Sequence, residues 1–345
     1  MHKAKKNDQP RQHTITTIDR NRQEQTKNYT FTLKTIIMKK ITFLLFIIPL
    51  CISAQGQLSE NNYRIYSVKL AKEVSLNDIA EEMKNYDVLF FGEEHNDSVT
   101  HYIEKTMFEL LHSKFGDNLS LSMEMFDRDV QTVMDEYLKG HIREKNFTKD
   151  ARIWSNYRDY KPLVEFAKDK KLDVVCANAP SRYTNLAGRK GQKALMELPD
   201  ESKKYFAPLP YDTATGNYYK KLIAVSQHTP VTTNDTSKVK MPVMPMGQFN
   251  LIMGQSLWDA TMAYSIAQYI KKNKTKKIMQ VNGKFHSDEG FAIVTQLKKY
   301  SPKTKSLIIS TASDDSFPNI DWNEYKKFGD YIIITDPNVP RTFKE

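Results

Sequence analysis

The chain has 345 residues and a formal net charge of +10. Most of the basic excess lies at the N-terminus: residues 1–56 hold 10 of the 51 Lys and Arg residues and 3 of the 41 Asp and Glu residues, so the remainder carries a net charge of +3. This balance gives no electrostatic case for nucleic-acid binding, and the length suits one large α/β domain.

The N-terminal segment has the features of a secretory signal. Lys39 and Lys40 precede an apolar run over residues 41–50, and small residues follow it. A basic region, a short apolar region and a small-residue cleavage site are typical of a signal peptide, and the run is too short to span a bilayer permanently. We therefore predict a signal peptide at residues 38–56, preceded by a disordered or wrongly assigned extension at residues 1–37.

The two cysteines bear on where the protein resides. Cys51 lies at the signal boundary and Cys176 inside an apolar run, so we predict no internal disulfide. Cys176 is expected to be a small buried hydrophobic residue. Cys51 is a candidate lipidation site, although the bulky Leu50 stands where a lipobox has a small residue. We predict an exported protein, periplasmic or associated with the outer membrane, with Cys51 as the candidate lipid anchor.

Strand-like and helix-like patterns alternate along the rest of the chain. Short runs rich in Val, Ile, Leu and Phe are typical of strands covered on both faces, and they span residues 87–91, 119–123, 173–177, 277–281, 306–310 and 331–335. Helical spacing of apolar residues predicts helices at residues 99–113, 130–138, 163–170 and 257–271. The alternation predicts an α/β protein with a mostly parallel sheet, flanking helices and a smaller, mainly helical inserted domain.

The predicted insertion covers about residues 184–254 of a domain that spans residues 57–345. It is much longer than a crossover requires, and it is rich in Pro, Tyr and Met, which favours a helical cap over the sheet edge. Tyr, Met and His are candidate haem-iron ligands, and the Arg182 guanidinium is suited to carboxylates. Ordinary core packing is the alternative explanation for the aromatic and Met residues.

Two similar turns follow two predicted strands, Gly92-Glu93-Glu94-His95 and Gly283-Lys284-Phe285-His286. Glycine allows the chain to turn sharply as a strand ends, which holds each histidine near the carboxyl edge of the sheet. Ligands of parallel sheets bind at this edge. Glu124 and Asn178 follow two other predicted strands, so we expect them at the same edge.

This set of side chains predicts a site, and it allows more than one chemistry. His95, His286 and Glu124 are candidate ligands for a divalent metal such as Zn or Fe. Glu93 and Glu124 are candidate catalytic carboxylates of a metal-dependent hydrolase, acting on a bound water. A neutral hydrogen-bonded network that fixes the strand ends is the structural alternative.

Several segments together resemble the ChaN-like haem-binding, iron-regulated proteins, whose superfamily includes the Tiki and TraB proteins and the erythromycin esterases. They are residues 88–95, 123–131, Trp154 with 160–163, 177–180, 255–263 and 283–286. The resemblance implies an α/β domain with a small helical domain, haem as the cofactor, and a role in iron or haem acquisition at the bacterial cell envelope. It also implies an outer-membrane haem receptor as a partner.

The resemblance further implies haem ligation by a tyrosine, with two stacked haems across a homodimer. Tyr183, beside Arg182, is the predicted ligand, with Tyr157 and Tyr160 as rivals. The remaining candidate haem-binding residues are His95, Arg128 and Asn178. Our first hypothesis is thus a haem-binding protein without enzymatic activity. The alternatives are the metal-dependent hydrolase and a carrier or scaffold whose ancestral site has decayed.

Overall fold

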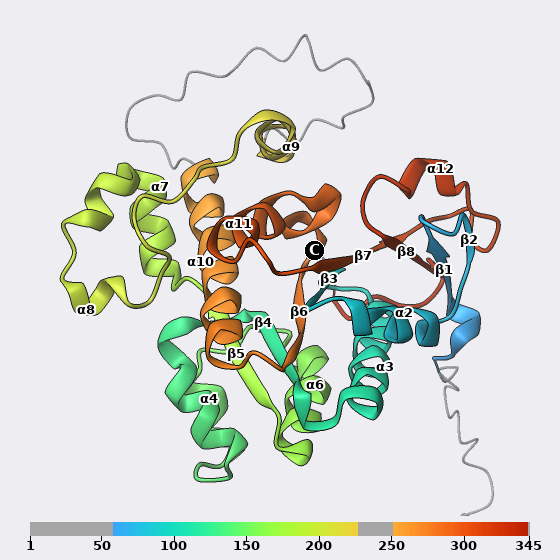
Figure 1. Ribbon diagram of the computed structural model, residues 1–345, viewed down its shortest axis with the longest axis horizontal. Coiled ribbons are helices and arrows are strands. Elements are labelled where there is room, and N and C mark those ends of the chain that lie inside the picture. Colours follow the sequence, from blue (N-terminus) through green and yellow to red (C-terminus); the bar gives the residue numbers. More distant parts are fainter. Residues whose placement is uncertain (1–57, 227–250, 344–345) are drawn as a thin grey trace, which may run out of the picture. The chain divides into compact units, whose positions relative to one another are not determined.

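The structure, a computed structural model, describes residues 58–226 and 251–343 (Figure 1). They belong to one compact unit, Leu58–Glu345. The predicted N-terminal extension, the signal peptide and Cys51 lie outside the described residues, as do Met241, Met244 and Met246 of the predicted cap.

An eight-stranded sheet lies at the centre, in the order β2-β1-β8-β7-β3-β6-β4-β5. The six strands from β8 to β5 are parallel, whereas β1 is antiparallel to both β8 and β2. The strands are β1 Tyr63–Ser67, β2 Lys72–Glu73, β3 Val88–Glu93, β4 Leu119–Asp127, β5 Asp173–Asn178, β6 Lys277–Gly283, β7 Ser306–Ser313 and β8 Tyr331–Thr335. The predicted α/β class with a mostly parallel sheet is confirmed.

Helices connect most of the strands. They are α2 Leu76–Glu82, α3 Ser98–Phe115, α4 Gln131–Leu138, α5 Glu144–Asp150, α6 Tyr157–Lys170, α7 Ser181–Met196, α8 Asp200–Lys203, α9 Gly216–Ser226, α10 Leu251–Lys272, α11 Ala292–Tyr300 and α12 Trp322–Tyr325. Short 3-10 helices follow β4 and β6, namely η4 Arg128–Val130 and η6 Lys284–His286.

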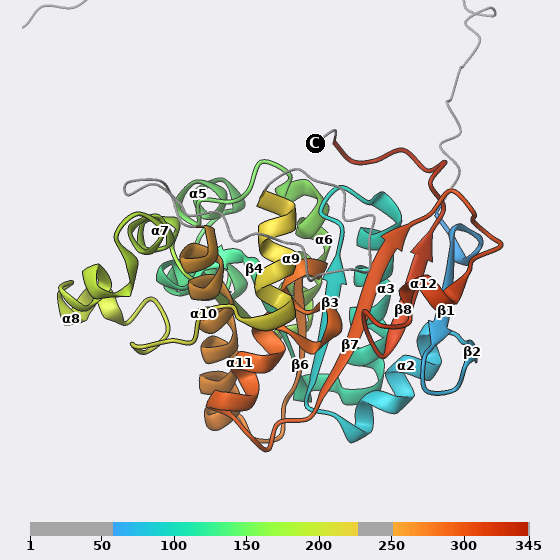
Figure 2. The ribbon, with the colours of Figure 1, turned by 90° about the horizontal axis from the view of Figure 1, so that it is seen from above.

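Both faces of the sheet are covered, which explains why its central strands are apolar throughout. Leu89 and Phe91 of β3 belong to a core that includes residues of α3 and α6. Val88 and Phe90 belong to a second core with residues of α10 and α11. Figures 1 and 2 show these two pairs of helices on opposite sides of the sheet. The alternation follows from the two-residue period of a strand.

The described part of the segment between β5 and β6 is mainly helical, as predicted. Helices α7 and α10 pack together, and Tyr183, Phe206 and Leu257 lie in a core of their own. Helix α10 also packs on β5 and α11, so it belongs to the cover of the sheet as well. Gly191 interrupts α7 with a φ of 72°, a backbone conformation that favours glycine. The exact limits of the inserted domain stay a prediction.

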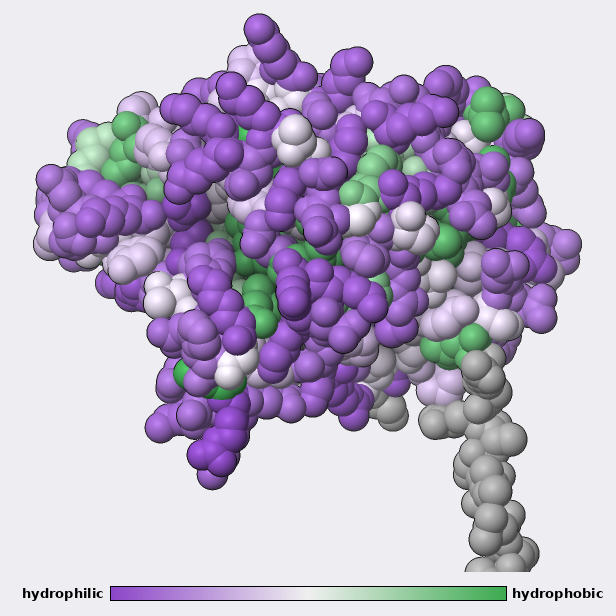
Figure 3. Space-filling view, turned by 60° about the horizontal axis from the view of Figure 1, so that its bottom comes forward, coloured by the Kyte–Doolittle hydropathy of each residue, from purple (hydrophilic) through white to green (hydrophobic). Residues whose placement is uncertain are grey.

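The surface has no large apolar area on the face shown in Figure 3, where hydrophobic side chains are visible in small separate groups. Within residues 58–226 and 251–343, the large hydrophobic residues that are exposed are Leu70 and Met196. In the same ranges, no helix has the length and apolar character needed to cross a membrane. Cys176 is buried and free, as predicted.

Candidate functional site

The two Gly-x-x-His turns lie side by side, because β3 and β6 are hydrogen-bonded neighbours. Gly92 pairs with Asn282, and Glu93 pairs with Gly283. Strand β4 lies on the other side of β6 and contributes Glu124. Three parallel strands therefore bring residues from distant parts of the sequence to one carboxyl edge, where α/β proteins bind ligands.

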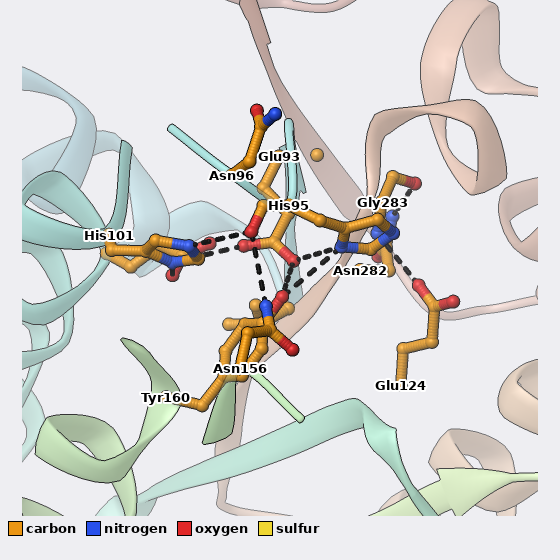
Figure 4. Close-up of polar contacts among 12 residues, drawn as sticks. Glu93, His95, Asn96, His101, Glu124, Asn156, Tyr160, Asn282 and Gly283 are labelled. Carbon is orange, nitrogen blue, oxygen red and sulfur yellow. Dashed lines mark hydrogen bonds and ion pairs between the residues drawn. The ribbon is translucent and has the colours of Figure 1, made fainter. Parts of the chain in front are cut away.

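His95 links the two turns (Figure 4). Its Nδ1 lies 2.7 Å from Oε1 of Glu93 and 3.3 Å from the hydroxyl of Tyr160. Burial disfavours the charged imidazole, but the contact with Glu93 outweighs burial and raises the pKa of His95 above its usual value. About a third of the side chain, 34%, stays exposed. A Cβ on Gly283 would lie 2.8 Å from Nε2 of His95, so the ring packs directly on the backbone of the second turn.

His286, the histidine of the second turn, lies between two buried carboxylates. Its Nδ1 is 2.5 Å from Oδ1 of Asp259, and its Nε2 is 3.3 Å from Oε1 of Glu124. Burial works against a charged ring, but these two carboxylates raise the pKa of His286 to about 10. Oε2 of Glu124 accepts a hydrogen bond from the backbone N–H of Gly283 at 2.8 Å, and the hydroxyl of Tyr218 donates to Asp259 at 2.7 Å.

His101 and Glu104 of α3 form a second buried set of contacts with Glu93. Nδ1 of His101 is 3.1 Å from Oε2 of Glu104 and 3.4 Å from Oε2 of Glu93. Burial and the charge of Glu93 raise the pKa of Glu104 well above its usual value. Burial would raise the pKa of Glu93 too, but His95 and His101 lower it to about 2. Of these two carboxyl groups, Glu104 is therefore the one that holds a proton.

The metal ligands expected from the sequence differ from the set that the geometry favours. Within the described ranges, one set of three or more residues has ligand atoms that all lie within 4.8 Å of one another, and it consists of Glu93, His101 and Glu104. His95, His286 and Glu124 are brought together but do not form such a set. His286 instead contacts Asp259 of α10 through Nδ1, and the sequence did not indicate that α10 packs at this site.

Tyr160 is placed at the site but is inaccessible. Its side chain is fully buried, and its hydroxyl donates to Oε1 of Glu93 at 2.7 Å. Burial and the charges of Glu93 and Glu104 raise its pKa, so the side chain stays a neutral phenol. Tyr157 is also buried, and its pKa is raised by burial.

The other predicted haem-binding residues form a separate group near α7. Arg182 pairs with Asp129 at 2.6 Å and covers the ring of Tyr183, which is 7% exposed and packs edge-on against Phe206. Arg128 donates to the hydroxyl of Ser265 on α10 at 2.6 Å. Oδ1 of Asn178 accepts from the backbone N–H of its neighbour, Ala179, at 2.9 Å. Their predicted role in haem binding stays a prediction.

A cavity of about 660 Å³ opens at the two turns. Its lining combines His95 and His286, the apolar Leu222 and Phe285, and the cationic Lys284 and Arg341. Both cations pair with Glu94, at 2.6 Å and 3.0 Å. Tyr183, Arg182 and Arg128 do not line it. A second cavity, of about 670 Å³, is lined by Tyr218 and Asp259 among others, so Asp259 connects its wall to His286.

Several site residues were missed by the sequence prediction. Asp259 and Gln255 lie in a segment that contributed to the family resemblance, but nothing local indicated that they contact His286. Glu104 follows His101 by three residues, a spacing that places both on one face of a helix and was available as a signal. Arg341 lies near the end of the chain, beyond every predicted motif.

Comparison with known families decides the relationship. A family model described as "Haem-binding uptake, Tiki superfamily, ChaN" matches residues 79–297. The chain belongs to this family. The resemblance inferred from the sequence is therefore confirmed, and the matched range contains both turns, Glu124 and Asp259.

One solved structure supports the fold. A structure titled "Cofacial heme binding to ChaN of Campylobacter jejuni" is 18% identical with a TM-score of 0.58, and the match covers 81% of this chain and 100% of that one. A mutant of the erythromycin esterase EreC (8% identity, TM-score 0.44, 80% and 99% covered) and a succinoglycan biosynthesis protein (10%, 0.46, 86% and 99%) are more remote. Comparison with curated proteins finds no match.

Proposed function

We propose that this protein binds haem in the cavity between the two Gly-x-x-His turns and serves haem or iron acquisition at the bacterial cell envelope. The observation that carries the proposal is the family match over residues 79–297, which includes every strand end that lines the cavity. The match concerns haem-binding uptake proteins. The proposal also includes three more specific statements: a role at the cell envelope, a haem receptor as a partner, and a homodimer.

The residues that line the cavity fit a haem. A volume of about 660 Å³ is within the range of small-molecule sites, which combine apolar walls with a few polar groups. Leu222 and Phe285 offer apolar contact for a porphyrin face. Lys284 and Arg341 offer positive charge for its propionates.

His95 is the residue in this cavity best suited to hold the haem iron. With Nδ1–H donating to the buried carboxylate of Glu93, the neutral ring keeps its lone pair on Nε2. A ligating histidine usually donates its other ring N–H to a carboxylate or carbonyl, which fixes its tautomer. The exposed third of the side chain favours His95 over Tyr160, which is buried, and over Tyr183, which packs inside the α7 core.

Haem titration tests the proposal. Purified protein should give a saturable Soret band with haemin at about one haem per chain, because one cavity holds the ligand. His95→Ala should shift the band and weaken binding at least about tenfold, whereas Tyr183→Phe should resemble the wild type. Loss of the band in Tyr183→Phe but not in His95→Ala would show that haem binds near α7 and not in this cavity. No saturable change in wild type would refute haem binding.

The location of the protein is a separate part of the proposal. The basic and apolar pattern of residues 38–56 supports export, and Cys51 is the candidate lipid anchor. Cell fractionation of wild type and Cys51→Ala distinguishes a lipid-anchored protein from a soluble periplasmic one. Removal of the anchor should move the protein from the membrane fraction to the soluble periplasmic fraction. Gel filtration with and without haemin tests the homodimer.

A metal-dependent hydrolase is the second candidate, and one observation favours it. The ring of His286 is held at Nδ1 by the buried Asp259, an arrangement that hydrolases use to orient a catalytic histidine. Screening of ester and peptide substrates tests it. Hydrolysis that disappears in both His286→Ala and Glu124→Gln would establish this activity, and wild-type rates in both variants would exclude it.

A further inference from the structure

Glu93, His101 and Glu104 form a compact buried cluster that haem binding does not explain. Their relative exposures are 1%, 8% and 0%, and each offers one ligand atom within 4.8 Å of the others. Burying two carboxylates beside each other is costly unless a positive charge compensates them. The cluster therefore needs either protons or a cation between its ligand atoms.

The hydrogen bond at the far side of His101 defines its tautomer. Nε2 of His101 lies 3.1 Å from the backbone carbonyl oxygen of His95, and a carbonyl oxygen only accepts, so Nε2 carries the hydrogen. In the neutral ring, the lone pair is then on Nδ1, which faces the carboxylate oxygens of Glu104 and Glu93. Three acceptors that face one another repel unless a positive centre lies between them. Metal-binding histidines commonly have this N–H to carbonyl contact.

The distances in the cluster suit a metal ion. Metal bonds to His nitrogen and carboxylate oxygen are about 2.0–2.2 Å long, so two ligands of one ion lie about 3.0–3.4 Å apart at ordinary coordination angles. The observed separations of Nδ1 of His101 from the two Oε2 atoms are 3.1 Å and 3.4 Å. In addition, Oε2 of Glu93, which faces Nδ1 of His101, is buried without a hydrogen-bond partner among the described residues, so this acceptor is left unpaired at the cluster.

We propose that Glu93, His101 and Glu104 bind a divalent transition-metal ion through one imidazole nitrogen and two carboxylate oxygens. This set suits Zn²⁺, Mn²⁺ or Fe²⁺, since Cu⁺ prefers sulfur and Ca²⁺ prefers oxygen alone. The site differs from the set of His95, His286 and Glu124 predicted from the sequence. Glu93 connects it to the haem cavity, because its other oxygen, Oε1, accepts from His95 and Tyr160.

Zinc binding by the haem-free, full-length protein tests the proposal. Zn²⁺ is titrated in competition with a chromophoric chelator, and zinc content is measured by elemental analysis. Wild type should bind about one Zn²⁺ per chain, and Glu104→Gln should bind at least about tenfold more weakly. Glu109→Gln is the matched control, because it is the same substitution on the same helix at a carboxylate paired with Lys105. It should bind like wild type.

Thermal unfolding separates loss of metal from loss of fold. Glu104→Gln keeps the side-chain volume and replaces a buried carboxyl group with a neutral amide, so the variant should fold. A chelator should lower the melting temperature of wild type but not of Glu104→Gln. Equal zinc binding by Glu104→Gln and Glu109→Gln overturns the proposal, and so does zinc that is lost in His286→Ala but retained in Glu104→Gln. Absence of zinc from wild type also overturns it and leaves a shared proton as the compensating charge.

Discussion

His95 and Gly283 are in direct contact although 187 residues separate them in the chain. A Cβ at position 283 would lie 2.8 Å from Nε2 and 3.0 Å from Cε1 of His95, closer than atoms of these types approach one another. The glycine of the second turn is therefore required less by its backbone conformation than by the ring that packs on it. The two turns act as one structural unit.

Gly283→Ala should displace His95. Relief of the clash requires movement of the ring or of the β6 backbone, at a cost of about 1–3 kcal/mol in the free energy of unfolding. Haem affinity, measured by Soret titration, should fall as well. The control is the double variant with His95→Ala: if the contact is the cause, Gly283→Ala should change affinity and stability much less in that background. Equal effects in both backgrounds would contradict this explanation.

Stability should fall as the pH rises above neutral. The pKa values of His286 and His101 are both raised to about 10 from 6.5. A group whose pKa is higher in the folded state contributes its full stability below the unfolded pKa and loses it as the pH approaches the folded value. Urea unfolding of chelator-treated protein at about pH 6.5, 8 and 9.5 should show a decrease on the order of 1 kcal/mol or more.

Variants identify the source of this pH dependence. His286→Gln should reduce the decrease in stability between neutral and alkaline pH, since the buried ion pairs with Asp259 and Glu124 are absent. His141→Gln, at an exposed position, should leave it unchanged. A wild-type curve that is flat over the same range would show that His286 is neutral in the folded protein.

Glu94 lowers the positive charge at the rim of the cavity. This carboxylate pairs with Lys284 and Arg341 and thereby neutralises part of their charge. Glu94→Gln should free Lys284, leave Arg341 paired with Asp97 at 3.3 Å, and strengthen haem binding severalfold at low salt, because the propionates are anionic. Lys284→Ala should have the opposite effect. The gain in Glu94→Gln should shrink as salt is added, and a gain independent of salt would point to a change in packing instead.

Asp97 fixes the start of the helix that carries His101 and Glu104. Its Oδ1 accepts from the backbone N–H groups of Val99 and Thr100, at 2.8 Å and 3.2 Å. Asp97→Ala should lower the free energy of unfolding by about 1–2 kcal/mol and also weaken zinc binding. Ser75 provides the control, since it caps α2 in the same way, away from the cluster. Ser75→Ala should reduce stability by a similar amount and leave zinc binding intact.

Local patterns predicted the elements of this fold well where both faces of a strand are buried. The six parallel strands were found with small errors in their ends, as was the helix that begins after Asp97. The two antiparallel strands β1 and β2 were missed, because β1 alternates between buried and half-exposed residues and β2 is two residues long. Neither has the continuous apolar run used to identify the others.

The arrangement of the site was predicted in part, and the contacts that were not predicted have a common physical cause. The two turns were expected at one edge, and the structure brings them together. Strand order was not predictable: β5 is an edge strand, so Asn178 and Tyr183, which follow it, lie two strands away from β6. The contact of Asp259 with His286 was not predictable either, because it depends on how α10 packs in the folded protein.

The position of β6 determines when the sheet can form. It lies between β3 and β4, two strands that end at least 150 positions before it begins and do not pair with each other. A growing chain that ends before Lys277 thus lacks the strand that joins its two halves, and pairings of such long range form slowly. Neither the cavity nor the contact of His95 with Gly283 can exist until the second turn has been made.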